Sequence, residues 1–381
     1  MLTALSLPCE NPAAIKESLA HLKQETFQPV SVKSGKAFFP EANRLWGISV
    51  QLYALRGGTT NGFGDFAALG DFVHQAAPLG ADAVAISPVH ALFAAAPDHF
   101  SPYAPSTRLF LNPLYAPLDR CAGKTKEKLI DWPRASARKW TDLRKSFARF
   151  RATENQAAYR VFVQEGGSRL LDHARFEVLD ARFRKQGLNH WRNWPLPYRD
   201  SRSPAVGVLS PDDNEVAFHL YAQWRADEGL AQAQQDARTA GMAVGLIADM
   251  AVGMDPAGSH AWSAPDEVLS GLAIGAPPDL FNARGQNWGL TNFSPLALRR
   301  TGFDGFVSTL RSAMRHAGGI RLDHAMGLER IWVIPEGASA GDGVYLHYPR
   351  DEMLALLVRE SRRHRAMVVA EDLGTVPRGF R

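Results

Sequence analysis

The chain has 381 residues, of which 45% are hydrophobic and 22% charged, and these proportions exclude a wholly disordered chain, a collagen and a coiled coil. The 43 basic and 39 acidic residues give a formal net charge of +4, too small to indicate nucleic acid as a partner. Two cysteines, Cys9 and Cys121, cannot form a disulfide framework and suit a reducing compartment. We find neither a signal-peptide pattern nor an apolar run long enough for a membrane span, and therefore expect a cytoplasmic protein.

After a lead-in over residues 1–45, short β-like runs alternate with helical patterns. Residues 47–52 predict a strand, residues 65–77 a helix and residues 83–86 a second strand. Strand, helix and strand in this order predict a βαβ unit with parallel strands. The segment 98–214 differs, because it holds prolines, tryptophans and charged helix-like stretches without a clear buried strand. We expect a mostly helical insertion there.

Three later β-like runs end in carboxylates. Acidic residues are poor strand formers and are costly to bury, so their recurrence at strand ends has a functional meaning. In a (β/α)8 barrel, the C-terminal ends of the parallel strands converge on the active site. The pattern predicts an α/β fold, a (β/α)8 barrel with about five of its strands in this sequence. The predicted strands are 244–249, 319–324 and 367–372, their acids are Asp249, Asp323 and Glu371, and the helical patterns are 215–241, 301–317 and 351–365.

Paired carboxylates are the groups that cleavage of a glycosidic bond requires. One attacks or stabilises an oxocarbenium-like centre, and the other protonates the leaving oxygen. Arg321 stands two residues before Asp323, so both point to the same face of a strand. We expect this guanidinium to keep Asp323 ionised, as a nucleophile requires, and Glu371 to be the proton donor. A capping role after each strand is the alternative, and it is weaker for three acids in succession.

Aromatic residues in or beside predicted loops give weaker support for a carbohydrate site. Sugars stack on aromatic faces, so these side chains could line a glucan groove. Taken singly, such a residue more often fills a core or packs on the surface. The residues are Tyr53, Tyr103, Trp262, Phe281 and Trp288.

An ordered set of motifs resembles the 4-α-glucanotransferases called amylomaltase or disproportionating enzyme, glycoside hydrolase family 77. The motifs are GISVQLY at 47–53, SPY at 101–103, NPL at 112–114, GAPPD at 275–279, GQNWG at 285–289, IRLDH at 320–324 and AEDLGT at 370–375. The resemblance implies a retaining double displacement on maltooligosaccharides or other α-1,4-glucans in a barrel of the α-amylase type. It implies Asp323 as nucleophile and Glu371 as general acid/base, with no metal and no organic cofactor.

The resemblance also implies a set of substrate-binding residues. Arg321 and His324 belong to the subsite of the nucleophile, and Asp249 is the acid of an earlier strand motif. A flexible loop over 280–285 leans over the glucan. The residues Asp279 and Trp288 flank that loop, and Tyr53, Ser101 and Tyr103 lie along the donor or acceptor side.

The family also needs a third carboxylate, an aspartate on a strand well downstream of the glutamate. The sequence ends at Arg381, so we expect a barrel that is incomplete at its C-terminus, and an inactive glucan-binding fragment is the alternative to a working transferase. The expected organisation is a lead-in over 1–45, the start of the catalytic barrel over 46–97, the helical insertion over 98–214, and the continued barrel over 215–381.

Other interpretations compete with the transferase. The segment 62–67 fits the G-x-G-x-x-A pattern of dinucleotide-binding turns, but the preceding loop is long and the expected acid after the second strand is missing. An α-glucan hydrolase would use the same chemistry with water as acceptor, and a fragment that binds glucan without turnover is a further alternative. The basic stretch 134–151 predicts a solvated helix face. No zinc or calcium motif is found, and His90 and His99 fit packing positions.

Overall fold

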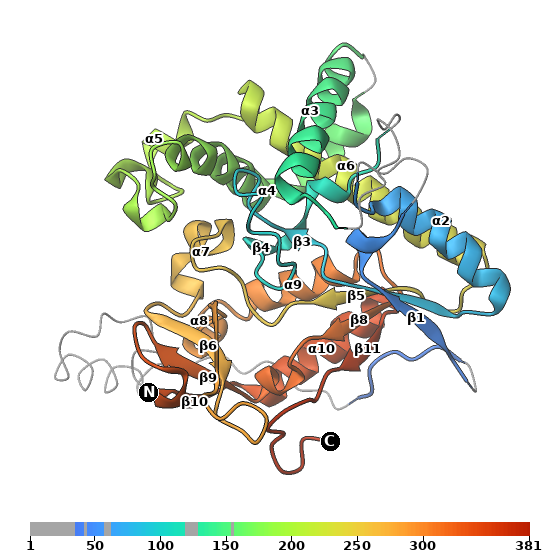
Figure 1. Ribbon diagram of the computed structural model, residues 1–381, viewed down its shortest axis with the longest axis vertical. Coiled ribbons are helices and arrows are strands. Elements are labelled where there is room, and N and C mark those ends of the chain that lie inside the picture. Colours follow the sequence, from blue (N-terminus) through green and yellow to red (C-terminus); the bar gives the residue numbers. More distant parts are fainter. Residues whose placement is uncertain (1–34, 42–43, 57–61, 119–128, 154–155) are drawn as a thin grey trace.

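The computed structural model describes residues 35–41, 44–56, 62–118, 129–153 and 156–381 (Figure 1). Cys9, Cys121 and most of the lead-in over 1–45 lie outside these residues.

A parallel five-stranded sheet with the order β1-β2-β5-β8-β11 forms the centre of the lower part of the molecule (Figure 1). Each neighbouring pair is parallel, as the alternation of strands and helices predicts. The five strands and the helices between them confirm the predicted barrel type, and the sheet is open among the described residues. The strands are β1 (Gly47–Val50), β2 (Ala83–Ile86), β5 (Gly245–Met250), β8 (Gly319–Leu322) and β11 (Met367–Ala370).

Helices connect the strands of this sheet, as in βαβ units. α2 (Phe66–Ala76) joins β1 to β2, and α6 (Asn214–Thr239) leads into β5. α7 (Ser259–Ser263), α8 (Pro295–Arg300) and α9 (Asp304–Met314) follow β5, while α10 (Arg350–His364) joins β8 to β11. The sequence placed α2, α6, α9 and α10 within a few residues, whereas α7 and α8 were not predicted.

Packing accounts for the glycines that suggested a dinucleotide-binding turn. A Cβ on Gly64 would lie 2.1 Å from the carbonyl oxygen of Leu52, so only glycine allows this approach of the two segments. The helix behind the turn is capped by Asp65, whose carboxylate accepts a hydrogen bond of 3.1 Å from the backbone N–H of Ala68.

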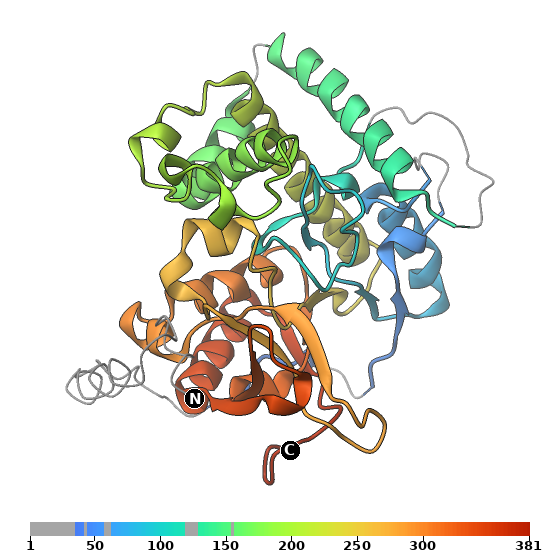
Figure 2. The same ribbon diagram turned by 60° about the vertical axis from the view of Figure 1, so that its left-hand side comes forward.

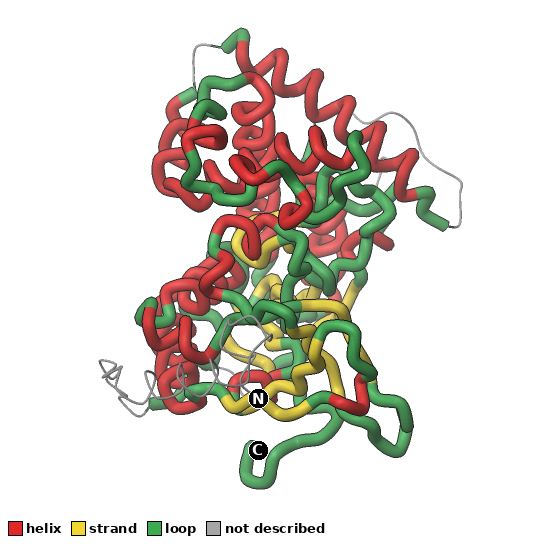
Figure 3. Tube along the Cα trace, turned by 90° about the vertical axis from the view of Figure 1, so that its left-hand side faces the viewer, coloured by secondary structure: helices red, strands yellow, loops and turns green. Residues whose placement is uncertain are grey.

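The α-helices of the segment 98–214 lie in the upper part of the molecule (Figure 1 and Figure 3). These helices are α3 (Trp132–Arg151), α4 (Ala157–Arg184) and α5 (Pro204–Gly207). The expectation that the segment lacks a buried strand is wrong, because β4 (Thr107–Leu111) pairs with β3 (His90–Ala91). Arg108 breaks the apolar pattern of β4, yet it is buried and donates to the carbonyl oxygens of Ala251 and Val252.

A second sheet was not predicted from the sequence. It is antiparallel, with the order β10-β9-β6-β7, and it is built from segments that follow β5 and β8. It therefore belongs to the loops at the C-terminal ends of the parallel strands. Figure 2 shows these orange and red elements below the green helices of the insertion. The strands are β6 (Leu272–Ala276), β7 (Gln286–Leu290), β9 (Arg330–Pro335) and β10 (Val344–His347).

Several clusters of buried side chains form the core of the molecule. One cluster joins β5, β8, α9 and α10, and another joins α2, β2, α3 and α6. Trp262, an expected sugar-lining residue, is instead fully buried in a third cluster with Trp194 and Phe176. Its indole N–H donates to the carbonyl oxygen of Tyr198 at 2.9 Å, which satisfies the buried donor.

A buried ion pair joins the insertion to the barrel. The Lys139 ammonium on α3 lies 3.3 Å from a carboxylate oxygen of Asp65, and both side chains are at most 2% exposed. The same carboxylate caps α2, so one acidic group holds the start of a barrel helix and the middle of an insertion helix.

We expect Lys139→Met to lower the free energy of unfolding by about 3 kcal/mol, because it leaves the Asp65 charge buried without its cation. Urea denaturation followed by circular dichroism measures this loss. Lys145→Met is the matched control: Lys145 pairs with Asp142 on the same helix, but its side chain is 65% exposed. The control should lose less than about 1 kcal/mol. Equal losses in the two variants would contradict this account of the ion pair.

Candidate active site

A cavity of about 530 Å³ lies at the C-terminal ends of β8 and β11, between the parallel sheet and the antiparallel sheet. Eight of the ten predicted site residues line it: Ser101, Tyr103, Asp279, Trp288, Arg321, Asp323, His324 and Glu371. Asp249 and Tyr53 are not among its lining residues.

The parallel ladder brings the two expected catalytic acids to neighbouring strands. The backbone N–H of Asp323 donates to the carbonyl oxygen of Met250 at 3.1 Å. The backbone N–H of Glu371 donates to the carbonyl oxygen of Leu322 at 3.0 Å. The Glu371 carboxylate accepts hydrogen bonds of 2.8 Å from the backbone N–H groups of His324 and Leu373. His324 has a left-handed backbone with φ of 50°, which forms this turn directly after Asp323. The backbone therefore fixes where the Glu371 carboxylate lies.

Arg321 connects two acids from neighbouring strands. Its Nη1 lies 2.6 Å from Asp249 Oδ1 and 3.1 Å from Asp323 Oδ1. Asp249 is 5% exposed, and its other oxygen accepts a hydrogen bond of 3.0 Å from the Tyr103 hydroxyl. Asp249 thus lies behind the cavity and orients Arg321 and Tyr103, two side chains that do line it.

Burial changes the expected electrostatics of the nucleophile candidate. Burial raises the pKa of Asp323 above its ordinary value, while the Arg321 guanidinium opposes this shift and the charge of Glu371 adds to it. The sequence argument considered only the guanidinium, which favours the ionised form. The ionised form of Asp323 is therefore lost as the pH falls through the raised pKa. Burial likewise raises the pKa of Asp249 and lowers that of His324.

The predicted aromatic residues and loop occupy different places. Trp288 contacts His324 edge-to-face, with ring centroids 5.3 Å apart. Tyr53 packs edge-to-face on Trp132 with ring centroids 5.8 Å apart and does not line this cavity, so its place along the glucan stays a prediction. The Asp279 carboxylate accepts from the backbone N–H groups of Phe281 and Asn282 at 2.8 and 2.6 Å, which shapes the expected loop. Phe281 itself is fully exposed.

Three of the further lining residues stand on β9 and β10 of the antiparallel sheet. They are Arg330, Trp332 and Tyr345. The sequence carried a signal for this strand, because Ile331 and Val333 alternate with Arg330 and Trp332. In the structure Ile331 and Val333 are buried, and the other two side chains are partly exposed. This alternation is the pattern of a half-buried strand.

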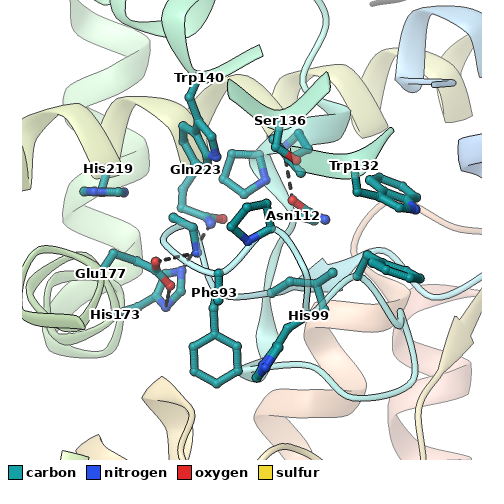
Figure 4. Close-up of a pocket in the computed structure, with 17 residues that line it drawn as sticks. Phe93, His99, Asn112, Trp132, Ser136, Trp140, His173, Glu177, His219 and Gln223 are labelled. Carbon is teal, nitrogen blue, oxygen red and sulfur yellow. Dashed lines mark hydrogen bonds and ion pairs between the residues drawn. The ribbon is translucent and has the colours of Figure 1, made fainter. Parts of the chain in front are cut away.

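A second, narrower pocket lies between β3, β4 and the insertion helices, and Figure 4 shows its side chains. Glu177 is 3% exposed, and one of its oxygens accepts a hydrogen bond of 3.0 Å from the backbone N–H of Ala94. Burial raises the pKa of Glu177 to about 8 and lowers the pKa values of His173 and His219 to about 3. At neutral pH this pocket therefore holds mainly uncharged side chains. Among the two expected packing histidines, His90 is buried and His99 contacts Phe93.

The fold and the cavity define a carboxylate-bearing cleft at the C-terminal ends of parallel strands, the position of the active site in barrel enzymes. A family model described as 4-alpha-glucanotransferase, glycoside hydrolase family 77, matches residues 50–381, and the chain belongs to this family. This confirms the resemblance drawn from the sequence motifs.

Individual relatives agree with this assignment. The chain is 33% identical over 371 residues to the 4-alpha-glucanotransferase of Haemophilus influenzae, covering 88% of this chain and 53% of that protein. It is 34% identical over 361 residues to that of Mycobacterium tuberculosis, covering 87% and 49%. The chain thus spans about half the length of the curated relatives it matches.

Two solved structures have the same fold. The amylomaltase of Corynebacterium glutamicum matches with a TM-score of 0.72 and 30% identity, over 88% of this chain and 48% of that one. The amylomaltase of Streptococcus agalactiae, solved in complex with acarbose, matches with a TM-score of 0.76 and 19% identity over 88% and 70%.

Two further properties concern the described part of the chain. None of its helices combines the length and the apolar character needed to cross a membrane. Nor does it contain a group of three or more His, Cys, Asp or Glu side chains placed to hold a metal ion.

We expect Arg321→Gln to raise the pKa of Asp323 further, because it removes the cation that opposes the effect of burial. Carboxyl-carbon NMR titration of the labelled chain measures this directly and requires no turnover. Arg284→Gln, in the exposed loop over 280–285, is the control and should leave the Asp323 pKa unchanged. An unchanged or lowered pKa in Arg321→Gln would contradict the described electrostatics.

The buried Glu177 predicts a pH-dependent stability. Between its ordinary pKa of 4.5 and its folded pKa of about 8, the folded state keeps a proton that the unfolded state releases. The free energy of unfolding therefore falls as the pH rises through this window. Between about pH 5 and pH 8 this decrease in the free energy of unfolding is on the order of 3 kcal/mol, and Glu177→Gln removes it. Denaturation at both pH values should show a flatter dependence for Glu177→Gln, whereas the exposed control Glu336→Gln should follow the unsubstituted chain. A parallel dependence in Glu177→Gln would refute the assignment.

Proposed function

We propose that this chain carries the bond-breaking centre of a 4-α-glucanotransferase, with Asp323 as the nucleophile and Glu371 as the general acid/base. The observation that carries the proposal is the pair of carboxylates on neighbouring parallel strands, facing one cavity, in a chain of glycoside hydrolase family 77. The substrates are maltooligosaccharides and other α-1,4-glucans. One structural neighbour is an amylomaltase in complex with acarbose, which agrees with a sugar-sized cavity.

The first half of the reaction breaks the donor bond. A carboxylate oxygen of Asp323 attacks the anomeric carbon while Glu371 gives its proton to the glycosidic oxygen, and the reducing-end piece leaves with that proton. Arg321, 3.1 Å from Asp323, favours the ionised nucleophile against the effect of burial. Tyr103 and Asp249 hold Arg321 in place through the chain of hydrogen bonds behind the cavity.

The second half transfers the donor. The Glu371 carboxylate takes the proton from the 4-hydroxyl of an acceptor sugar, whose oxygen displaces Asp323 from the anomeric carbon. Two inversions retain the configuration. His324, Trp288, Ser101 and Asp279 line the same cavity and are proposed to contact the glucan. No metal or organic cofactor takes part in this scheme.

Two alternatives use the same cavity. An α-glucan hydrolase differs only in using water as the acceptor, and a glucan-binding chain without turnover differs in lacking the chemical step. We further propose that the protein works in the cytoplasm, since two cysteines among 381 residues fit a reducing compartment.

Incubation with maltotriose separates these functions. Transfer gives glucose together with maltooligosaccharides longer than maltotriose, and Asp323→Asn should lower their formation by several orders of magnitude. Chromatography by chain length measures both, with Asp351→Asn, an exposed acid on α10, as the matched control. Maltose and glucose alone would establish a hydrolase, and binding without products would establish the third function. Transfer at an undiminished rate in Asp323→Asn would refute the assignment of the nucleophile.

A further inference from the structure

Three side chains of the antiparallel sheet form one connected surface in the active-site cavity. Tyr345 on β10 lies opposite Trp332 on β9, and their rings meet edge-to-face with centroids 5.0 Å apart and planes at 75°. The Arg330 guanidinium lies 4.0 Å from the centroid of the Tyr345 ring. We call Arg330, Trp332 and Tyr345 the aromatic shelf. All three line the cavity that holds Asp323 and Glu371.

The shelf is held in a fixed orientation. The indole N–H of Trp332 donates to the carbonyl oxygen of Ala340 at 2.9 Å, so this donor is already used within the protein. Gly343 lies so close that a Cβ there would be 2.4 Å from Trp332 Nε1. Arg330 is anchored by a long hydrogen bond of 3.4 Å to the carbonyl oxygen of Thr375. The ring surfaces, rather than the indole N–H, are therefore what the shelf offers to a ligand.

The order of strands places Tyr345 at the edge of the sheet opposite Trp288. Trp288 on β7 contacts His324, the residue that follows Asp323, whereas Tyr345 stands on β10 at the opposite edge of the sheet. Three strand spacings separate β7 from β10, which corresponds to about 14 Å. The cavity thus has a reactive end near Trp288 and a remote end at the shelf.

We propose that the aromatic shelf is a remote sugar subsite, which takes a glucose residue of the α-1,4-glucan several positions from the bond that is cleaved. A pyranose ring presents C–H groups on its faces and hydroxyls at its rim, so it stacks on aromatic rings while a nearby donor binds a hydroxyl. The guanidinium of Arg330 supplies such donors beside the Tyr345 ring, because Arg330 lines the cavity. This inference rests on the proposed function and adds a selection for glucan length.

The test compares a long and a short ligand by isothermal titration of the 381-residue chain. For maltoheptaose, Trp332→Leu and Tyr345→Leu should each raise the dissociation constant about tenfold, as expected for the loss of one stacking contact. For maltotriose, the same variants should bind as the unsubstituted chain does, because the shorter ligand fills the reactive end. Trp46→Leu is the matched control, since Trp46 is 50% exposed and does not line the cavity.

Two results would overturn the inference: unchanged maltoheptaose binding in both shelf variants, or equal losses for the two ligands. Tyr345→Leu keeps the test valid if Trp332→Leu is unstable, because Tyr345 stands on an edge strand, and thermal denaturation verifies the folding of each variant. Failure of the proposed function gives a different result, in which the unsubstituted chain binds neither ligand. In that case the shelf proposal falls together with the function on which it rests.

Discussion

The candidate active site depends on a single guanidinium between two acids. Arg321 on β8 contacts Asp249 from β5 and Asp323 at the end of its own strand. Burial alone would favour the neutral form of both acids, and such neutral acids could not act as a nucleophile or anchor a cation. The positive charge of Arg321 opposes this effect of burial and favours the ionised carboxylates of Asp249 and Asp323. The Tyr103 hydroxyl completes the arrangement from the loop after β3, so the site needs both the sheet and the start of the insertion.

Strand pairing explains why this arrangement is possible. β5, β8 and β11 are adjacent and parallel, and their registers place Asp249 opposite Arg321 and Ala370 opposite Leu322. The register alone therefore brings the acids at the strand ends close together. The left-handed turn at His324 then gives the Glu371 carboxylate a backbone donor. A few backbone hydrogen bonds thus position the two groups on which the proposed chemistry depends.

Much of this could be predicted from the sequence, and the failures have physical reasons. The parallel strands were predictable because each is a short apolar run that ends in an acid or a turn. β4 was missed because a buried arginine interrupts its apolar pattern. The place of Trp262 was left open because an aromatic residue near a loop looks the same whether it lines a groove or fills a core, and only packing distinguishes the two. The antiparallel sheet was not predicted, because its strands are short and come from two segments that are separate in the sequence.

The central claim is that Asp323 forms the covalent bond to the donor sugar. The most direct measurement uses Glu371→Gln and a maltotriosyl fluoride, whose leaving group needs no proton, so that the glycosyl-enzyme forms but is discharged slowly. Proteolysis and mass spectrometry then locate the attached sugar. The account predicts a maltotriosyl group on the peptide that contains Asp323, and none when Asp323→Asn is added. A sugar attached to any other residue would contradict it.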